Sequence, residues 1–213
     1  MSVEQEWEER YLNDQSGWDR KGINPVLHEW FARMPSSERR VLIPGCGNGY
    51  EVIELARMGF DVTGIDIAFT PVARMHRELE IEGLQAEVIQ ADMFDYIPET
   101  PFDAIYEQTS LCAINPEQRE AYEKKLHDWL KPGGSLCALF MQTEAEDGPP
   151  FHCDVIAMKE LFDASRWDWG EDEALHSPHP SGRIELGHKL IKRYGKCPLF
   201  TGSGAVRCLF EWL

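Results

Sequence analysis

The feature that most constrains the fold of this chain is an alternation of short apolar runs with helix-like segments over residues 40–142. The apolar runs cover residues 40–44, 61–66, 86–92, 102–108 and 135–142, and apolar residues at helical spacing lie between them at 49–59, 70–83 and 115–134. This alternation is typical of parallel βαβ units whose helices cover both faces of one sheet. The sequence therefore predicts an α/β fold, a single doubly wound sheet that is mostly parallel.

Two of the expected helices begin with capping signals. Thr70 is followed by Pro71, and Asn115 is followed by Pro116. A threonine or asparagine at the N-cap with proline at the first helical position is a favoured start. We therefore expect Thr70 and Asn115 to be N-caps.

The segments outside this core are less regular. Residues 1–34 have helical spacing that is interrupted by the stretch "NDQSG". Residues 205–213 read as a strand with no helix after it, which predicts an antiparallel strand at or near an edge of the sheet. We expect residues 143–204 to form substrate-side loops and an insertion, with a short helix at 157–165, because long irregular segments beside a rigid sheet commonly carry recognition.

Size and charge limit the possible partners. The 213 residues, 43% of them hydrophobic, are enough for one domain spanning residues 1–213, with a core unit at 38–142. Lys and Arg number 21 against 37 Asp and Glu, a net charge of −16, which disfavours nucleic acid and anionic membranes as partners. The basic stretch 189–196 is expected to be a solvated loop. No apolar stripe suggests self-association, so we expect a monomer with a small-molecule substrate.

The cysteines indicate a reducing compartment. They are dispersed, without a Cys-x-x-Cys pair, at positions 46, 112, 137, 153, 197 and 208. Cys137 and Cys208 lie in apolar strand-like runs, where a thiol packs as a small hydrophobe. The chain shows no signal-peptide pattern and no apolar run near the ~20 residues of a membrane span. The expected location is the cytoplasm.

A glycine turn follows the first predicted strand, in "VLIPGCGNGY" at residues 41–50. Gly45, Gly47 and Gly49 let the backbone approach a ligand, and the next helix presents free N–H groups there. In a doubly wound sheet, ligands bind outside the carboxyl ends of the strands. The turn therefore predicts a ligand site, with simple close packing of strand and helix as the alternative.

Acidic residues end the next strands at the same edge. Asp66 can accept hydrogen bonds from both hydroxyls of a ribose, although it could also cap the following helix. Asp92 offers an acceptor for an exocyclic amine, and Met93 and Phe94 offer apolar faces for a flat ring. Together these residues favour a nucleoside-containing ligand.

The glycine spacing separates the possible nucleosides. The turn reads G-x-G-x-G, with Tyr50 where the dinucleotide fingerprint G-x-G-x-x-G needs its last glycine. No Gly-Lys-Ser/Thr of a Walker A loop follows. A nicotinamide dinucleotide and a nucleoside triphosphate are both disfavoured.

These residues carry a family resemblance over about residues 5–163. The stretch "VLIPGCGNGYEVIELARMGFDVTGIDI", with "ADMF" and "LKPGG", resembles the Rossmann-like class I S-adenosylmethionine-dependent methyltransferases. The run "CAINPEQR" with a later "GPPF" is similar to the thiopurine S-methyltransferase family and its thiol and halide methyltransferase relatives. The N-terminal "EWEERY" and "GWD" resemble that family's aromatic segment over the cofactor. At Glu107 and Gln108 this chain departs from the family's Asp or Asp-Arg.

The resemblance implies a site for S-adenosylmethionine under an N-terminal helical lid at residues 1–34. The implied cofactor-binding residues are Trp7, Tyr11, Trp18, Gly45, Cys46, Gly47, Asn48, Gly49, Asp66, Ile67, Asp92, Met93, Phe94, Glu107 and Gln108. Aromatic rings near a sulfonium are physically reasonable because a cation favours a π face. Cys46 is expected to contribute its backbone and a small side chain, not a nucleophile.

The implied reaction is methyl transfer to a small soft nucleophile: the sulfur of a small thiol or thiopurine-like compound, or halide, thiocyanate or hydrosulfide. A thiol of pKa ~8.5 already holds a few per cent thiolate at neutral pH, so little base catalysis is needed. Arg119 resembles a position near the substrate, and an ion pair with Glu123 is an equally good interpretation.

The histidines at 152, 176 and 179 could be bases or pocket residues, and positions in surface loops are the preferred interpretation. The spacing of His176 and His179 with Cys153 matches no zinc pattern, so no metal site is expected. Three other functions stay open: small-molecule O- or N-methyl transfer, nicotinamide-dependent oxidation, and nucleoside sensing without catalysis.

Overall fold

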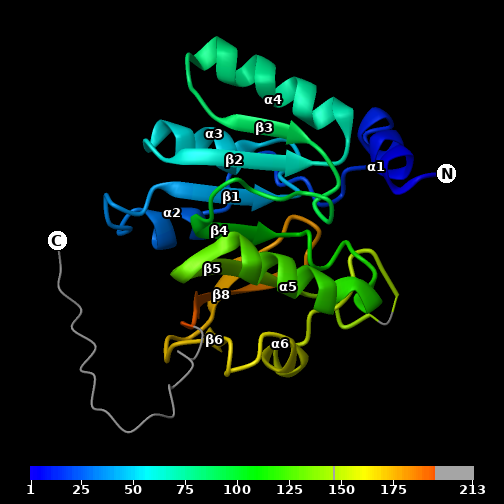
Figure 1. The fold of residues 1–213 in the computed structure, drawn as a ribbon. Helices are drawn as coiled ribbons and strands as arrows, with labels where there is room; N and C mark the ends of the chain where they lie inside the picture. The colour runs from blue at the N-terminus through cyan, green and yellow to red at the C-terminus, as the bar shows by residue number, and fades with distance from the viewer. Residues whose placement is uncertain (146, 195–213) are drawn as a thin grey trace, which may run out of the picture.

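The computed structural model describes residues 1–145 and 147–194, and the expected strand at 205–213 lies outside them. Its strands form one mixed sheet in the order β3-β2-β1-β4-β5-β8-β6, with β7 paired to β8 (Figure 1). The chain first winds from β1 through β2 to β3, and then returns to the other side of β1 with β4 and β5. The predicted doubly wound α/β sheet is confirmed.

The parallel half of the sheet matches the sequence closely. Its strands are β1 (Arg40–Pro44), β2 (Asp61–Asp66), β3 (Glu87–Gln90), β4 (Phe102–Gln108) and β5 (Leu130–Gln142). Val41 pairs with Val62 of β2 on one side and Ala104 of β4 on the other. Because β1 has neighbours running parallel on both sides, its carboxyl end lies at the point where the winding direction changes.

The helices were predicted with shifts of a few residues at their ends. They are α1 (Val3–Leu12), α2 (Val26–Phe31), α3 (Tyr50–Arg57), α4 (Phe69–Glu82), the short 3-10 helix η1 (Pro116–Gln118), α5 (Arg119–Trp129) and α6 (Val155–Leu161). Asn115 caps η1 as expected, by accepting a hydrogen bond from the Glu117 N–H. No helix in the described ranges is both long and apolar enough to cross a membrane.

Two separate apolar cores cover the two faces of the sheet. One contains the buried residues of α2, α3 and α4, including Trp30, Leu55 and Met75. The other contains those of α5 and α6, including Trp129 and Met158. This distribution leaves the carboxyl edge of β1 to β4 uncovered by either layer, and α1 lies beside that edge in Figure 1.

The region after residue 166 is more regular than expected. It contains β6 (Trp167–Asp168), β7 (Leu175–Pro178) and β8 (Ile184–Lys192), and β8 pairs antiparallel with β5 from Ser135 to Gln142. Antiparallel strands therefore extend the sheet beyond β5, and they come from the segment that was expected to be an irregular insertion. The interpretation of Lys189 onward as a solvated loop is wrong for residues 189–192, which belong to β8.

Two boundary predictions also fail for local reasons. The helix expected over 115–134 ends at Trp129, and Leu130 is already extended, because the residues before Pro132 are disfavoured in helical conformation. Thr70 is not an N-cap, since α4 begins one residue earlier and Ala68 occupies the cap without a side-chain hydrogen bond.

Candidate functional site

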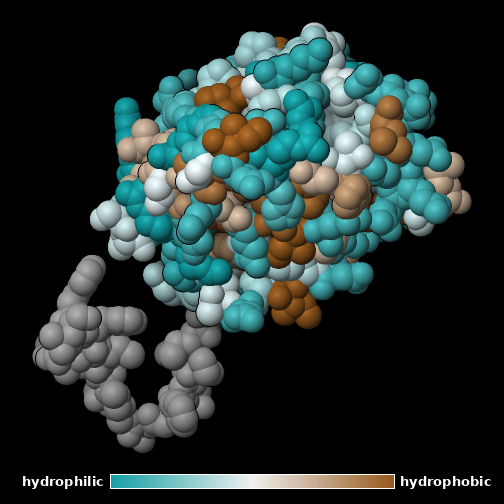
Figure 2. All heavy atoms as spheres, turned by 90° about the horizontal axis from the view of Figure 1, so that it is seen from above, coloured by the Kyte–Doolittle hydropathy of each residue, from teal (hydrophilic) through white to brown (hydrophobic). Residues whose placement is uncertain are grey.

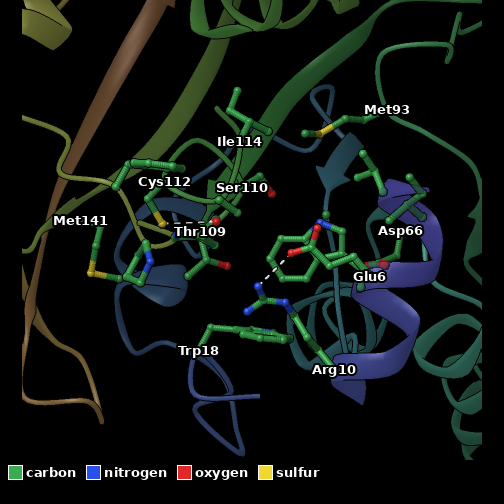
Figure 3. Close-up of a pocket in the computed structure, with 18 of the residues that line it drawn as sticks. Glu6, Arg10, Trp18, Asp66, Met93, Thr109, Ser110, Cys112, Ile114 and Met141 are labelled. Carbon is green, nitrogen blue, oxygen red and sulfur yellow. Dashed lines mark hydrogen bonds and ion pairs between the residues drawn. The ribbon is translucent and has the colours of Figure 1, made fainter. Parts of the chain in front are cut away.

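A cavity of about 640 Å³ opens at the carboxyl ends of β1, β2 and β4. Its walls come from α1, the strand ends, the turn after β4 and the segment around Phe151. In Figure 3, Asp66 and Met93 lie on one side, Cys112 and Met141 lie on the opposite side, and Thr109 and Ser110 lie between them. The cavity is large enough for a nucleoside-sized ligand and a second small molecule.

The glycine turn borders this cavity, and Gly45 lines it. Gly45, Gly47 and Gly49 all have positive φ, between 53° and 74°. A Cβ at Gly45 would lie 2.2 Å from Ser110 Oγ, and one at Gly47 would lie 3.1 Å from the Tyr11 hydroxyl. Only glycine fits such backbone so close to its neighbours. Gly49 faces Met75 instead, so its role is close packing of α3 against α4.

Asp66 links the end of β2 to this turn. Its Oδ2 accepts a hydrogen bond from the Gly47 N–H at 2.8 Å, and its Oδ1 accepts one from the Ala68 N–H at 2.9 Å. The carboxylate is buried, and burial raises its pKa against the opposing hydrogen bonds. Asp66 and the half-buried Ile67 both line the cavity. The side chain thus shapes the turn and faces the ligand space at once.

Asp92, Met93 and Phe94 continue the same wall, as the sequence predicted. Asp92 Oδ1 accepts a hydrogen bond from the Phe94 N–H at 2.9 Å, which fixes the loop after β3. Phe94 packs 6.0 Å from the ring of Tyr122. This arrangement places one carboxylate and two apolar side chains along one stretch of wall, which suits the edge and faces of a flat heterocycle.

Three aromatic side chains from the N-terminal segment close the cavity on another side. Trp18 meets Trp7 and Tyr11 edge to face, with ring centroids 5.2 Å and 5.5 Å away. All three residues line the cavity, and α1 itself has no buried residue. A peripheral helix whose aromatic residues face a cavity has the geometry of a lid.

The lid is tied to α4 by Glu8. Its carboxylate accepts hydrogen bonds from the Thr70 N–H, at 2.9 Å, and from the Thr70 hydroxyl. These bonds cap the first turn of α4, which has no side-chain cap of its own. The threonine was thus correctly associated with the helix start, but the capping group comes from α1.

A smaller hollow of about 60 Å³ adjoins the main cavity between the glycine turn and the connection from α1 to α2. Cys46, Gly47, Asn48 and Gln108 line this hollow. Asn48 donates a hydrogen bond to Asp19 at 2.9 Å. Burial raises the pKa of the Cys46 thiol well above its usual range, which agrees with a packing residue that stays neutral.

Gln108 contacts a network of buried polar groups beside this hollow. Its amide donates to Glu185 of β8, at 2.9 Å to Oε2, and Arg20 and Asn24 donate to the same carboxylate. Burial raises the pKa of Glu185 to about 7. The network joins the connection after the lid to the middle of the sheet.

Two predicted site residues lie behind the wall and not in it. Glu107 is fully buried, and Arg119 donates a hydrogen bond to the His152 carbonyl at 3.0 Å. Neither residue lines the cavity. The alternative pairing of Arg119 with Glu123 is not formed, since Glu123 pairs with Arg166 at 3.0 Å.

Several lining residues were not assigned to the site from the sequence. They are Thr109, Ser110, Cys112, Ile114, Met141, Pro149, Pro150, Phe151, His179 and Arg183. His179 is buried, not a surface-loop residue: its Nδ1 lies 2.7 Å from Ser181 Oγ and its Nε2 lies 3.3 Å from the Trp18 carbonyl oxygen. The part of the chain that the structure describes contains no group of three or more metal-ligating side chains.

Comparison with known proteins identifies the family. The family model described as thiopurine S-methyltransferase matches residues 2–179. This chain belongs to the thiopurine S-methyltransferase family. Thiocyanate methyltransferase 1 of Arabidopsis thaliana is 31% identical over 160 residues, which cover 73% of this chain and 70% of the relative. A thiopurine S-methyltransferase of Vibrio atlanticus (strain LGP32) is 27% identical over 207 residues, 89% of this chain and 93% of the relative.

Solved structures agree on the fold of this thiopurine S-methyltransferase family member. The 1,6-didemethyltoxoflavin-N1-methyltransferase of Burkholderia thailandensis superposes with a TM-score of 0.72 at 19% identity, covering 90% of this chain and 88% of that one. Magnesium protoporphyrin IX methyltransferase from Synechocystis PCC 6803 gives a TM-score of 0.70 at 13% identity, covering 90% of this chain and 98% of that one. The family member is an S-adenosylmethionine-dependent S-methyltransferase.

Proposed function

We propose that the 640 Å³ cavity holds S-adenosylmethionine against its Asp66 side and a small soft nucleophile against its Cys112 side. The residues present suit the cofactor. The glycine turn leaves backbone bare, Asp66 and Asp92 supply acceptors for ribose and adenine, and the rings of the lid suit a sulfonium cation. When bound, this cofactor supplies an electrophilic methyl group on sulfur.

The substrate class rests on one observation about the opposite wall. Cys112, Ile114, Met141 and Phe151 give it an apolar part that is rich in polarizable sulfur. Both ring nitrogens of His179 already have partners, which leaves this histidine poorly placed as a base. A nucleophile that needs little base catalysis fits this wall: the sulfur of a small thiol or thiopurine-like compound, or halide, thiocyanate or hydrosulfide.

The protein makes three contributions to the proposed methyl transfer. The lid and the wall exclude water from the reacting atoms, the glycine turn and Asp66 fix the cofactor side, and the residues around Cys112 orient the nucleophile in line with the methyl group. The proton of a thiol substrate leaves to solvent before transfer, because the thiolate is the attacking species.

A nucleophile panel tests this function. Purified protein is incubated with methyl-labelled cofactor and thiols, halides, thiocyanate, phenols or amines, and labelled product is counted. We expect turnover on thiols or soft anions and little on phenols and amines. Preferred methylation of a phenol or amine would reassign the enzyme to O- or N-methyl transfer. Calorimetry with S-adenosylhomocysteine and NAD should show binding of the first only.

The cellular setting is part of the same proposal. The segment from α1 to Trp18 acts as the lid, since α2 packs in the core, and residues 38–142 form the cofactor core. The segments around Phe151 and His179 supply the substrate side, since β8 belongs to the sheet. The protein is one monomeric, cytoplasmic domain that binds no nucleic acid. The four described cysteines are free and buried, which suits a reducing compartment. On the face shown in Figure 2, hydrophilic residues predominate and apolar residues form small separate patches. Light scattering tests the monomer.

A further inference from the structure

The turn after β4 is held in an unusual conformation. Thr109 has a φ of 65°, a value that is rare for a β-branched residue. Its hydroxyl donates to the Gln108 carbonyl at 2.7 Å, and the next residue, Ser110, donates to the Pro44 carbonyl at 2.9 Å. Thr109, Ser110 and Cys112 all line the cavity. Strain of this kind persists only where surrounding groups enforce it, and it is common at functional sites.

Glu107 is the group that enforces this turn from behind. Its Oε1 accepts a hydrogen bond from the Leu111 N–H at 2.7 Å, across the base of the turn. The side chain is fully buried, and within the described residues its Oε2 has no hydrogen-bond partner. A buried oxygen without a partner is costly, so a fold that keeps one calls for an explanation.

Arg119 holds a second part of the wall from the same side. Its guanidinium donates to the His152 carbonyl at 3.0 Å and contacts Cys153 Sγ at 3.5 Å. These residues directly follow Phe151, which lines the cavity and donates its N–H to the Cys112 carbonyl at 2.7 Å. The segment 149–153 and the turn after β4 therefore form one continuous wall.

The charge of the half-buried Arg119 acts on the buried carboxyl of Glu107. Burial raises the pKa of Glu107 to about 7, while the backbone N–H groups of Leu111 and Ser110 and the charge of Arg119 act in the opposite direction. The Glu107 carboxyl and the Arg119 guanidinium are each bonded separately to the same wall.

We propose that Glu107 and Arg119 are positioning residues that together set the shape of the nucleophile side of the cavity, and that neither touches substrate or cofactor. This inference rests on the proposed function, because it assigns Cys112 and Phe151 to the nucleophile side. It replaces the sequence-based roles of Glu107 as a cofactor contact and Arg119 as a substrate contact.

The test compares a large with a small nucleophile. Thiophenol is wide enough to contact both wall segments, whereas hydrosulfide contacts little of either. E107Q, which keeps an acceptor for Leu111, should retain most of the activity on thiophenol. In E107L, which removes that acceptor, we expect kcat/KM for thiophenol to fall at least tenfold through a higher KM. We expect kcat/KM for hydrosulfide to fall less than threefold, and the Kd of S-adenosylhomocysteine to stay within twofold.

R119M should also lower kcat/KM for thiophenol more than kcat/KM for hydrosulfide, because it releases the His152 carbonyl. The kcat/KM of the double variant for thiophenol should be at most threefold below that of the less active single variant, since the effects of residues acting as one unit are not additive. If E107L does not fold, R119M carries the test alone. The matched control is E123Q, a buried carboxyl one turn along α5 that bonds to Trp167 and Arg166 away from the cavity, and it should leave the thiophenol to hydrosulfide ratio unchanged.

Two results would overturn the inference. One is an equal loss for thiophenol and hydrosulfide, which is the outcome of direct contact with the reacting anion. The other is weaker S-adenosylhomocysteine binding in either single variant, which would return these residues to the cofactor side. Failure of the proposed function looks different: the wild type would then turn over neither nucleophile.

Discussion

Asp66 has its two carboxylate oxygens on the backbone of two different segments while its side chain lines the cavity. Its contact with Gly47 holds the glycine turn in the shape that a ligand would meet. A hydrogen bond to a charged group contributes about 1.5 to 3 kcal/mol. At the scale of single residues, cofactor affinity should therefore depend on Asp66 twice, through the turn and through direct contact.

Replacing Asp66 with alanine should weaken S-adenosylhomocysteine binding at least 30-fold, about 2 kcal/mol, as measured by calorimetry. Asp61 offers a matched control because it lies at the opposite end of β2, with an exposed side chain that pairs with Arg40. Asp61→Ala should bind normally. Equal affinities of the two variants would show that Asp66 does not contact the cofactor.

Residues of the candidate site could be predicted where neighbouring residues in the sequence indicate their position. Asp66, Asp92 and the glycines were predictable because each lies next to a strand end in the sequence itself. Thr109 and Cys112 carry no local signal, since their exposure to the cavity depends on the strained turn that Glu107 holds. Glu107 was noticed for its position, but burial behind the wall is a property of the assembled sheet.

Two single carboxylates, those of Glu8 and Glu185, connect separate elements of this molecule. Glu8 joins α1 to the start of α4, and Glu185 joins β8 to β4 and to the connection after the lid. Because α1 has no buried residue, its attachment depends on such contacts and on the aromatic cluster of Trp7, Tyr11 and Trp18. Lid position should therefore respond to small changes in polar contacts without loss of the fold.

Glu8→Gln should loosen the lid. A lost charged cap costs about 1 kcal/mol, so the free energy of unfolding should fall by no more than that and S-adenosylhomocysteine affinity should fall about fivefold. Calorimetry and limited proteolysis of the N-terminal segment, with and without S-adenosylhomocysteine, measure the effect. Glu9→Gln, one residue on and exposed, is the control. Faster cleavage in both variants alike would refute the specific role of Glu8.

Glu185 gives the protein a pH dependence of stability. Its pKa rises from 4.5 to about 7 on folding because the side chain is buried. Between these values only the folded state binds the proton, so this group's contribution falls as pH rises through the window and is fully unfavourable above pH 7. The cost at pH 8 is about 3 kcal/mol at most.

Denaturant unfolding of wild type and Glu185→Gln at pH 5 and pH 8 checks this. The variant should gain stability relative to wild type on going from pH 5 to pH 8, and the comparison cancels other titrating groups. Glu173→Gln, at an exposed position, should track wild type. A difference that stays constant with pH would exclude an ionisation change at Glu185.

The same carboxyl explains why β8 was not predicted. In this strand the side chains of Glu185 and Leu190 are buried while Ile184 is exposed, so the apolar pattern does not mark the inward face. A buried glutamate is tolerated because Arg20, Asn24 and Gln108 supply donors. Those partners lie 77 to 165 positions away in the sequence, and no local pattern reveals them.

Across the whole molecule, one cluster of polar contacts lies at the end of the sheet opposite the candidate site. At the amino ends of β1 and β4, Asp103 accepts hydrogen bonds from the Arg39 and Arg40 N–H groups and from Lys131. Burial alone would raise the pKa of Asp103, but these donors lower it below its usual value. The carboxyl ends carry the cavity instead.

Asp103→Asn should thus lower the free energy of unfolding by about 1 to 3 kcal/mol and leave S-adenosylhomocysteine affinity within twofold. The loss should shrink as pH falls through the folded-state pKa of Asp103, where the wild type loses the same contacts. Denaturant unfolding and calorimetry measure the two quantities. Parallel losses of stability and affinity would show that the two ends of the sheet are coupled.

The cap that Glu8 places on α4 also provides a spectroscopic reporter. The Thr70 amide proton is bonded to the lid and not to its own helix, so it can exchange with solvent whenever α1 lifts away. Its exchange rate, followed by NMR in deuterated water, measures at a single backbone position how often the lid opens. Addition of S-adenosylhomocysteine should slow that one amide more than its neighbours in α4, with no label or mutation introduced.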